Sequence, residues 1–138
     1  MIQRALVALF ALTLVASACS QGMEPLPSDV NVIVDMKEYA ITLSVTTIKP
    51  GTIKFGIRNN GTMVHDFDLY KTDLPIDQLP VDTGSAKVKM DGLVKQMINI
   101  APNRSKTLSA DLAAGRYVIV CNVAGHYQLK MRAELQVQ

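Results

Sequence analysis

The sequence is poor in aromatic residues and in clustered charge. It has no tryptophan, and aromatic residues make up 5% of its 138 residues. The formal net charge is +2, and lysine and arginine form no run that would concentrate positive charge on one stretch. A nucleic-acid-binding domain needs a basic surface, so we expect no DNA or RNA partner. The short chain also excludes a large multi-domain enzyme and leaves room for one modest core.

The N-terminus has the pattern of an export signal, which we assign to residues 1–18. Arg4 supplies a positive charge, residues 5–16 are mostly apolar, and small residues at 16–18 form a cleavage site. The apolar run is shorter than the roughly 20 residues of a comfortable membrane span. Residues 15–19 resemble a bacterial lipobox, whose cysteine, here Cys19, is lipidated; simple secretion is the alternative. We therefore expect an exported protein, in the periplasm or on the extracellular face, tethered to the membrane through Cys19.

Cysteine and histidine are scarce, with two of each in the whole chain. Because Cys19 belongs to the processing site, Cys121 is the only cysteine of the expected domain, and no disulfide can form within it. In an oxidising compartment a lone thiol is usually avoided, bound to a metal or catalytic. Cys121 is therefore a candidate functional residue.

The remaining sequence has the pattern of a single β domain. Residues 19–28 contain one glycine and two prolines and predict a tether, followed by a domain over residues 29–138. Apolar residues there mostly alternate with polar ones in short runs rich in Val, Ile, Thr and Tyr, which is typical of strands. The expected strands are Val30–Met36, Tyr39–Thr47, Gly51–Asn59, His65–Lys71, Leu93–Ala101, Ser105–Leu112, Arg116–Asn122 and Leu129–Val137. Eight short strands predict an all-β sandwich.

The segment Thr72–Gly92 interrupts the alternation, because prolines and glycines divide it and its apolar residues have no clear period. We expect a long connection that crosses from one sheet of the sandwich to the other. One helical turn is expected near Ile76–Leu79.

Three metal-binding side chains follow one another near the C-terminus with the spacing C-x4-H-x4-M: Cys121, His126 and Met131. Strand alternation turns Cys121 toward the interior. Gly125 then allows a tight turn that brings His126 back over the same point. The only other histidine, His65, lies where apolar residues alternate, so it shares the buried face.

Two imidazoles, a thiolate and a thioether form the donor set of blue-copper electron-transfer sites. Zinc fits less well, because structural zinc prefers four Cys or His ligands and catalytic zinc keeps an open water position. The thiolate and thioether favour Cu(I), the imidazoles accept either oxidation state, and a rigid sandwich limits ligand movement between the two. One mononuclear type 1 copper is therefore the expected cofactor.

At these residues the domain resembles the cupredoxins, the small blue copper proteins of the plastocyanin and azurin kind, over residues 29–138. The resemblance implies an eight-stranded Greek-key β-sandwich. It also implies that the equatorial copper ligands are His65, Cys121 and His126. The axial ligand would be Met131. Two positions depart from the usual pattern of the family. Asp66 stands where members commonly have an Asn that holds the copper loop, and Lys130 stands where they often have Gly.

The expected function is one-electron transfer in the bacterial cell envelope by a monomer that is not an enzyme. The alternative is a copper carrier or chaperone that uses the same residues to deliver the metal. A copper enzyme is disfavoured because His65 and His126 leave no histidine for a second copper. We expect transient partners, such as cytochromes or oxidase and reductase complexes, to dock near His126 over the apolar loop residues Val123 and Ala124, with Gly125.

Overall fold

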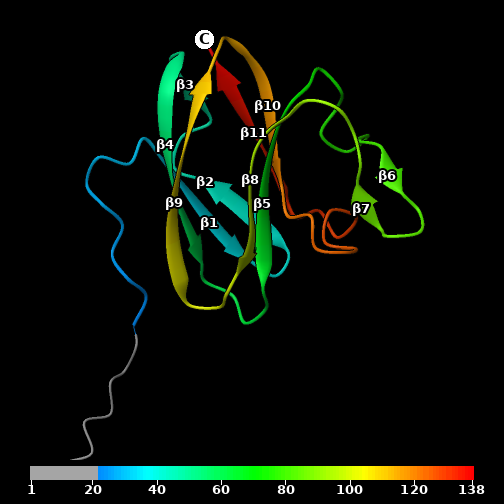
Figure 1. Cartoon of the computed structure of the whole chain (residues 1–138), viewed down its shortest axis with the longest axis horizontal. Helices are drawn as coiled ribbons and strands as arrows, with labels where there is room; N and C mark the ends of the chain where they lie inside the picture. The colour runs from blue at the N-terminus through cyan, green and yellow to red at the C-terminus, as the bar shows by residue number, and fades with distance from the viewer. Residues whose placement is uncertain (1–21) are drawn as a thin grey trace, which may run out of the picture.

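A computed structural model describes residues 22–138 (Figure 1). Within this range the chain forms eleven β-strands and no helix, so the all-β prediction is confirmed. No helix among these residues is long and apolar enough to span a membrane. The predicted export signal, residues 1–18, and the predicted lipidation site, Cys19, lie outside the described range.

The first sheet has four strands. In spatial order they are β2 (Ala40–Leu43), β1 (Val32–Lys37), β4 (Gly51–Asn59) and β9 (Arg104–Leu112). The β1 strand runs parallel to β4, and the other neighbours are antiparallel. The long antiparallel ladder between β4 and β9 extends from one end of the molecule to the other (Figure 1).

The second sheet has five strands. In spatial order they are β3 (Thr47–Ile48), β11 (Arg132–Val137), β10 (Gly115–Val120), β5 (His65–Lys71) and β8 (Leu93–Ile100). The β3 strand is parallel to β11, whereas the pairs β11–β10, β10–β5 and β5–β8 are antiparallel. The β5 and β10 strands are therefore neighbours within this sheet. Three predicted ligands lie at its strand ends: His65 begins β5, Cys121 follows β10 and Met131 precedes β11.

The main core lies between the two sheets. Alternate residues of the strands point into it, as period-two patterns predict. Fully buried members come from both layers: Val32, Val34, Phe55, Ile57, Phe67, Leu69, Ile119 and Leu135. The rings of Phe55 and Phe67 lie 5.4 Å apart, in contact across the two sheets. Cys121 and Met131 belong to the same buried cluster, so the predicted sulfur ligands lie in the core.

A second, smaller core covers the outer face of β5 and β10. Val118 and Val120 of β10 pack there with residues of the connection Thr72–Gly92, including Leu79 and Val88. Within this connection, Val81–Asp82 (β6) and Lys87–Val88 (β7) form a short antiparallel hairpin, seen beside the sandwich in Figure 1. Both faces of the central strands are therefore buried.

Two expectations for this connection were wrong. It does not cross between sheets, because β5 and β8, the strands on either side of it, are neighbours in the second sheet. Ile76–Leu79 forms no helix; the local bond is a turn in which the Gln78 N–H donates to the Pro75 carbonyl at 2.9 Å. Leu79 packs with Val118 and Val120 of β10, and a helix of one turn is marginal by itself.

The predicted strand boundaries agree with the structure to within a few residues. One predicted strand is divided into two. The expected strand Tyr39–Thr47 is two strands, because β2 pairs in the first sheet and β3 pairs in the second. The chain changes sheets between them, near Ser44, whose backbone N–H donates to the Ile33 carbonyl at 2.9 Å. The Greek-key connection stays a prediction.

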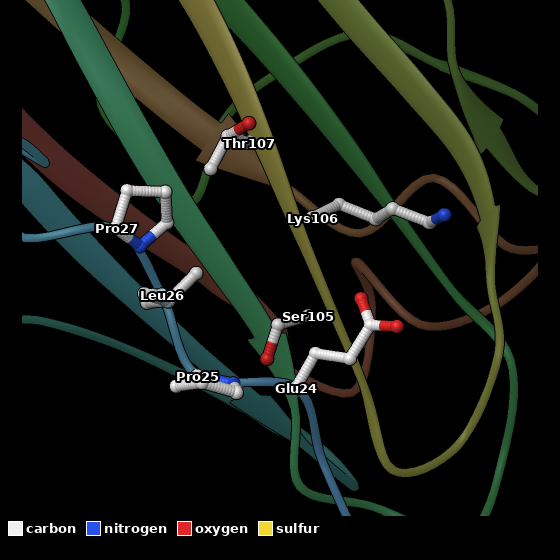
Figure 2. A pocket seen from close by; sticks show the side chains of 7 residues that line it. All are labelled: Glu24, Pro25, Leu26, Pro27, Ser105, Lys106 and Thr107. Atoms are coloured by element: carbon white, nitrogen blue, oxygen red, sulfur yellow. The ribbon is translucent and has the colours of Figure 1, made fainter.

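The described part of the predicted tether contacts the first sheet. A Cβ atom at Gly56 would lie 2.6 Å from Leu26, so the missing side chain makes room for Leu26 on the outer face of β4. Figure 2 shows this segment beside the start of β9. A shallow pocket of about 290 Å³ lies between them, lined by Glu24, Pro25, Leu26, Pro27, Ser105, Lys106 and Thr107. None of the four predicted ligands lines it.

Candidate metal centre

Two neighbouring strands place the first two ligands. His65 is the first residue of β5, and Cys121 directly follows the last residue of β10. The antiparallel register pairs Val120 with Asp68, so the start of β5 lies beside the end of β10. The Asp66 N–H donates to the Cys121 Sγ at 3.3 Å. Both His65 and Cys121 are fully buried, as strand alternation predicts.

A compact loop between β10 and β11 supplies the other two ligands. Gly125 has φ of 81°, in the left-handed region that glycine adopts without strain. The His126 N–H donates to the Val123 carbonyl, which turns the imidazole back toward Cys121. Met131 closes the loop, because its N–H donates to the His126 carbonyl and its carbonyl accepts from the Cys121 N–H, each at 3.0 Å.

The donor atoms converge as the sequence predicts. The Cys121 Sγ lies 3.6 Å from the His65 Nδ1 and 3.3 Å from the His126 Nδ1. One ligand atom from each of these three residues lies within 4.8 Å of the others. Met131 is fully buried and is joined through its backbone to both loop ligands. Three of the four predicted residues therefore bring their ligand atoms together, and Met131 is buried on the same loop.

Burial keeps the donors in their neutral forms. Desolvation raises the pKa of the Cys121 thiol to about 11. Desolvation also lowers the pKa of His65, with the neighbouring His126 adding to the effect, and lowers that of His126. At neutral pH both imidazoles thus have a free lone pair, and the thiol keeps its proton until a metal displaces it.

Hydrogen bonds from the connection Thr72–Gly92 hold the ligand loop in place. Asn122 accepts from the Val88 N–H at 2.7 Å and donates to the Val88 carbonyl at 3.1 Å. The Tyr127 hydroxyl accepts from the Leu79 N–H at 2.9 Å and donates to the Ile76 carbonyl at 3.0 Å. The residue after Cys121 and the residue after His126 are thereby fixed to one covering segment.

The turn between β1 and β2, which contains Glu38 and Tyr39, contacts both histidines. These contacts were not predicted from the sequence. The Tyr39 ring lies edge-on to the His126 ring, with centroids 5.1 Å apart. The Glu38 Oε1 lies 3.5 Å from the His65 Nε2. The motif contained no signal for either contact, because the turn lies far from all four ligands in sequence and meets them only through strand pairing.

The structure shows the local surroundings of the two positions that depart from the cupredoxin pattern. Asp66 does not hold the ligand loop with its side chain; its Oδ1 accepts from the Asn99 N–H of β8 at 2.8 Å. The Asn122 amide holds the loop instead. Lys130 has φ of 73°, in the left-handed region, where a glycine is the least strained residue.

Comparison with known proteins bears on the fold alone. No protein-family model and no curated protein sequence matches the chain. Among solved structures, auracyanin from Roseiflexus castenholzii has 19% identity and a TM-score of 0.59, covering 77% of this chain and 94% of that one. Auracyanin A, a "blue" copper protein from Chloroflexus aurantiacus, has 22% identity and a TM-score of 0.53, covering 78% and 98%. Rusticyanin from Thiobacillus ferrooxidans has 19% identity and a TM-score of 0.54, covering 78% and 75%.

These similarities, together with the two packed sheets, show that the chain has the cupredoxin fold. The site described above lies at one end of that fold, where the β10–β11 loop meets the start of β5.

Proposed function

We propose that this protein binds one type 1 copper ion and carries single electrons. The observation that carries the proposal is the convergence of one ligand atom from each of His65, Cys121 and His126 within 4.8 Å, with Met131 buried on the same loop. His65, Cys121 and His126 would be the equatorial ligands and Met131 the axial one. Two soft sulfur donors and two imidazoles suit copper better than zinc. When bound, copper supplies the one-electron couple between Cu(I) and Cu(II).

The surrounding protein favours electron transfer because it restricts ligand movement. All four ligand side chains are at least nine-tenths buried. The ligand loop is bonded to β5 through Cys121 and to the covering connection through Asn122 and Tyr127. Ligands that keep their positions in both oxidation states need little reorganisation.

Partners would dock over the segments that cover His126. His126 is 4% exposed, and the ring of Tyr39, which is itself partly exposed, contacts its imidazole. Exposed apolar side chains lie on the segments that carry or adjoin the site: Tyr39, Met63, Val64 and Leu129. Such a small apolar surface suits a transient redox complex. We expect the partner to be a cytochrome or an oxidase or reductase complex, bound by a monomer.

The cell envelope is the proposed location. The support is the sequence of residues 1–18, which has the pattern of an export signal. Lipidation of Cys19 would hold the domain on a membrane surface. Mass spectrometry of the protein purified from membranes should find a diacylglyceryl group on Cys19; an unmodified Cys19 would indicate simple secretion.

An absorption and EPR spectrum of the copper-loaded protein tests the proposed function. We expect intense visible colour from thiolate-to-copper charge transfer, reversible reduction and retention of the metal. Cys121→Ser should lose the colour and keep the fold, because serine differs from cysteine by one atom and the other members of the main core are unchanged. A pale protein that exchanges copper readily would contradict electron transfer and indicate copper delivery.

A further inference from the structure

The Glu38 carboxylate lies in a loop that is shaped to receive it. The backbone N–H groups of Thr62 and Met63 donate to Glu38 Oε1 at 2.7 and 2.6 Å. A Cβ atom at Gly61 would lie 2.5 Å from the same oxygen, so only glycine leaves space for it there. The Asn59 side chain holds the same loop: its Oδ1 accepts from the Gly61 N–H, and its Nδ2 donates to the Met63 carbonyl.

This carboxylate faces the side of His65 that points away from the other ligands. The His65 Nδ1 faces the Cys121 sulfur, and the Nε2 lies 3.5 Å from Glu38 Oε1. Nε2 is fully buried and has no hydrogen-bond partner among the described residues. A buried N–H without an acceptor is costly, and Glu38 Oε1 is the charged oxygen that faces this nitrogen, at 3.5 Å.

Resting on the proposed copper function, we infer that Glu38 positions His65 and sets the reduction potential of the site. A carboxylate at Nε2 keeps the proton on that nitrogen, which leaves the Nδ1 lone pair facing Cys121. Its negative charge also increases the basicity of the imidazole and stabilises the more positive, oxidised site. Glu38 therefore holds the reduction potential below the value that the four ligands alone would give.

Glu38→Gln in the full-length, copper-loaded protein tests this role. The amide oxygen can still accept from Thr62 and Met63, so the variant removes the charge and keeps the shape. We expect the blue colour to remain and the reduction potential, measured by equilibrium redox titration, to rise. The matched control is Asp111→Asn, which removes one negative charge at the opposite end of the β4–β9 ladder from Asn59. It should leave the potential near that of the wild type.

A second variant tests the same role without changing the net charge. Gly61→Ala places a methyl group 2.5 Å from Glu38 Oε1 and should displace the carboxylate from His65, so the potential should rise here too. This variant decides the matter if Glu38→Gln fails to fold.

Unchanged potentials in a blue Glu38→Gln or Gly61→Ala protein would overturn the role of Glu38, as would an equal rise in Asp111→Asn. A wild-type chain that takes copper without blue colour would instead contradict the proposed function itself, and the role of Glu38 with it.

Discussion

At the scale of single residues, Cys121 shows how burial sets the chemistry of a ligand before any metal arrives. The same desolvation that raises its pKa to about 11 makes its thiolate a strongly basic donor. The Asp66 N–H bond to the sulfur acts in the opposite direction, because it stabilises the thiolate. Metal binding must therefore displace a proton.

We predict that loading with Cu(II) at pH 7 releases about one proton per copper ion, because the thiol is protonated and both imidazoles are neutral in the free protein. The release can be measured with a pH indicator in weakly buffered solution. Cys121→Ser should release fewer protons, since a serine hydroxyl does not ionise as readily. Copper uptake by the wild type without proton release would show that the thiol is not a ligand.

Lys130 offers a second prediction at this scale. Its φ of 73° costs a residue with a side chain of the order of 1 kcal/mol or more. Lys130→Gly should therefore raise the free energy of unfolding by up to about 1 kcal/mol. Glycine also increases the conformational entropy of the unfolded chain, which offsets part of this gain. Urea denaturation of the metal-free protein checks it. Loss of stability would mean that the lysine side chain makes a contribution that outweighs the strain.

At the scale of elements, the connection Thr72–Gly92 covers one face of the second sheet and also fixes the ligand loop. Tyr127 joins these two roles, since its ring packs in the second core and its hydroxyl bonds to Leu79 and Ile76. The rigidity of the site therefore depends on an element that contributes no ligand.

We predict that Tyr127→Phe lowers the free energy of unfolding by about 1–3 kcal/mol, because two backbone groups lose their partner, and that it accelerates copper loss to a chelator. Tyr117→Phe is the matched control: it removes one hydroxyl bond, to Ala113 at 2.8 Å, at the far end of β10. That control should lower stability and leave the rate of copper loss unchanged. Equal rates in the two variants would argue against a role of the connection in holding the loop.

At the scale of the whole molecule, stability depends on pH through carboxylates whose pKa values shift in opposite directions on folding. Desolvation raises the pKa of Asp68, which lies beneath the covering connection. The Arg58 guanidinium lowers the pKa of Asp35 on β1. The folded state thus holds the Asp68 proton more tightly than the unfolded chain does, and the Asp35 proton less tightly.

The sign for Asp68 follows from this difference in proton binding. Its ionisation makes the free energy of unfolding fall as pH rises from 3.8 through its raised pKa. Asp68→Asn should therefore be more stable than the wild type at neutral pH and lose that advantage below pH 3.8.

Asp35→Asn should behave in the opposite way, because its carboxylate contributes stability above pH 3.8 that is lost as pH falls through the lowered pKa. The stability of both variants and of the wild type can be measured by thermal unfolding at a series of pH values from neutral to below 3.8. A pH-independent difference between Asp68→Asn and the wild type would show that Asp68 has the same pKa in the folded protein and in the unfolded chain.

The sequence could predict the site because its ligands are few and regularly placed. Alternation along β5 and β10 predicted that His65 and Cys121 face the interior, and Gly125 predicted the turn that returns His126. Asp66 and Asp68, two charged residues of β5, are both buried. Their burial was not predictable, because it depends on the covering connection, whose sequence has no clear period.

Local sequence determined which residues form strands and which side chains can bind a soft metal, because strand alternation and ligand chemistry act over a few neighbouring positions. Only the tertiary structure decided that Glu38 and Tyr39 meet the two histidines, that Thr72–Gly92 covers the second sheet, and that Tyr39–Thr47 divides between two sheets. Those contacts join segments that are distant in the chain, and their geometry follows from strand order and register, which no local pattern encodes.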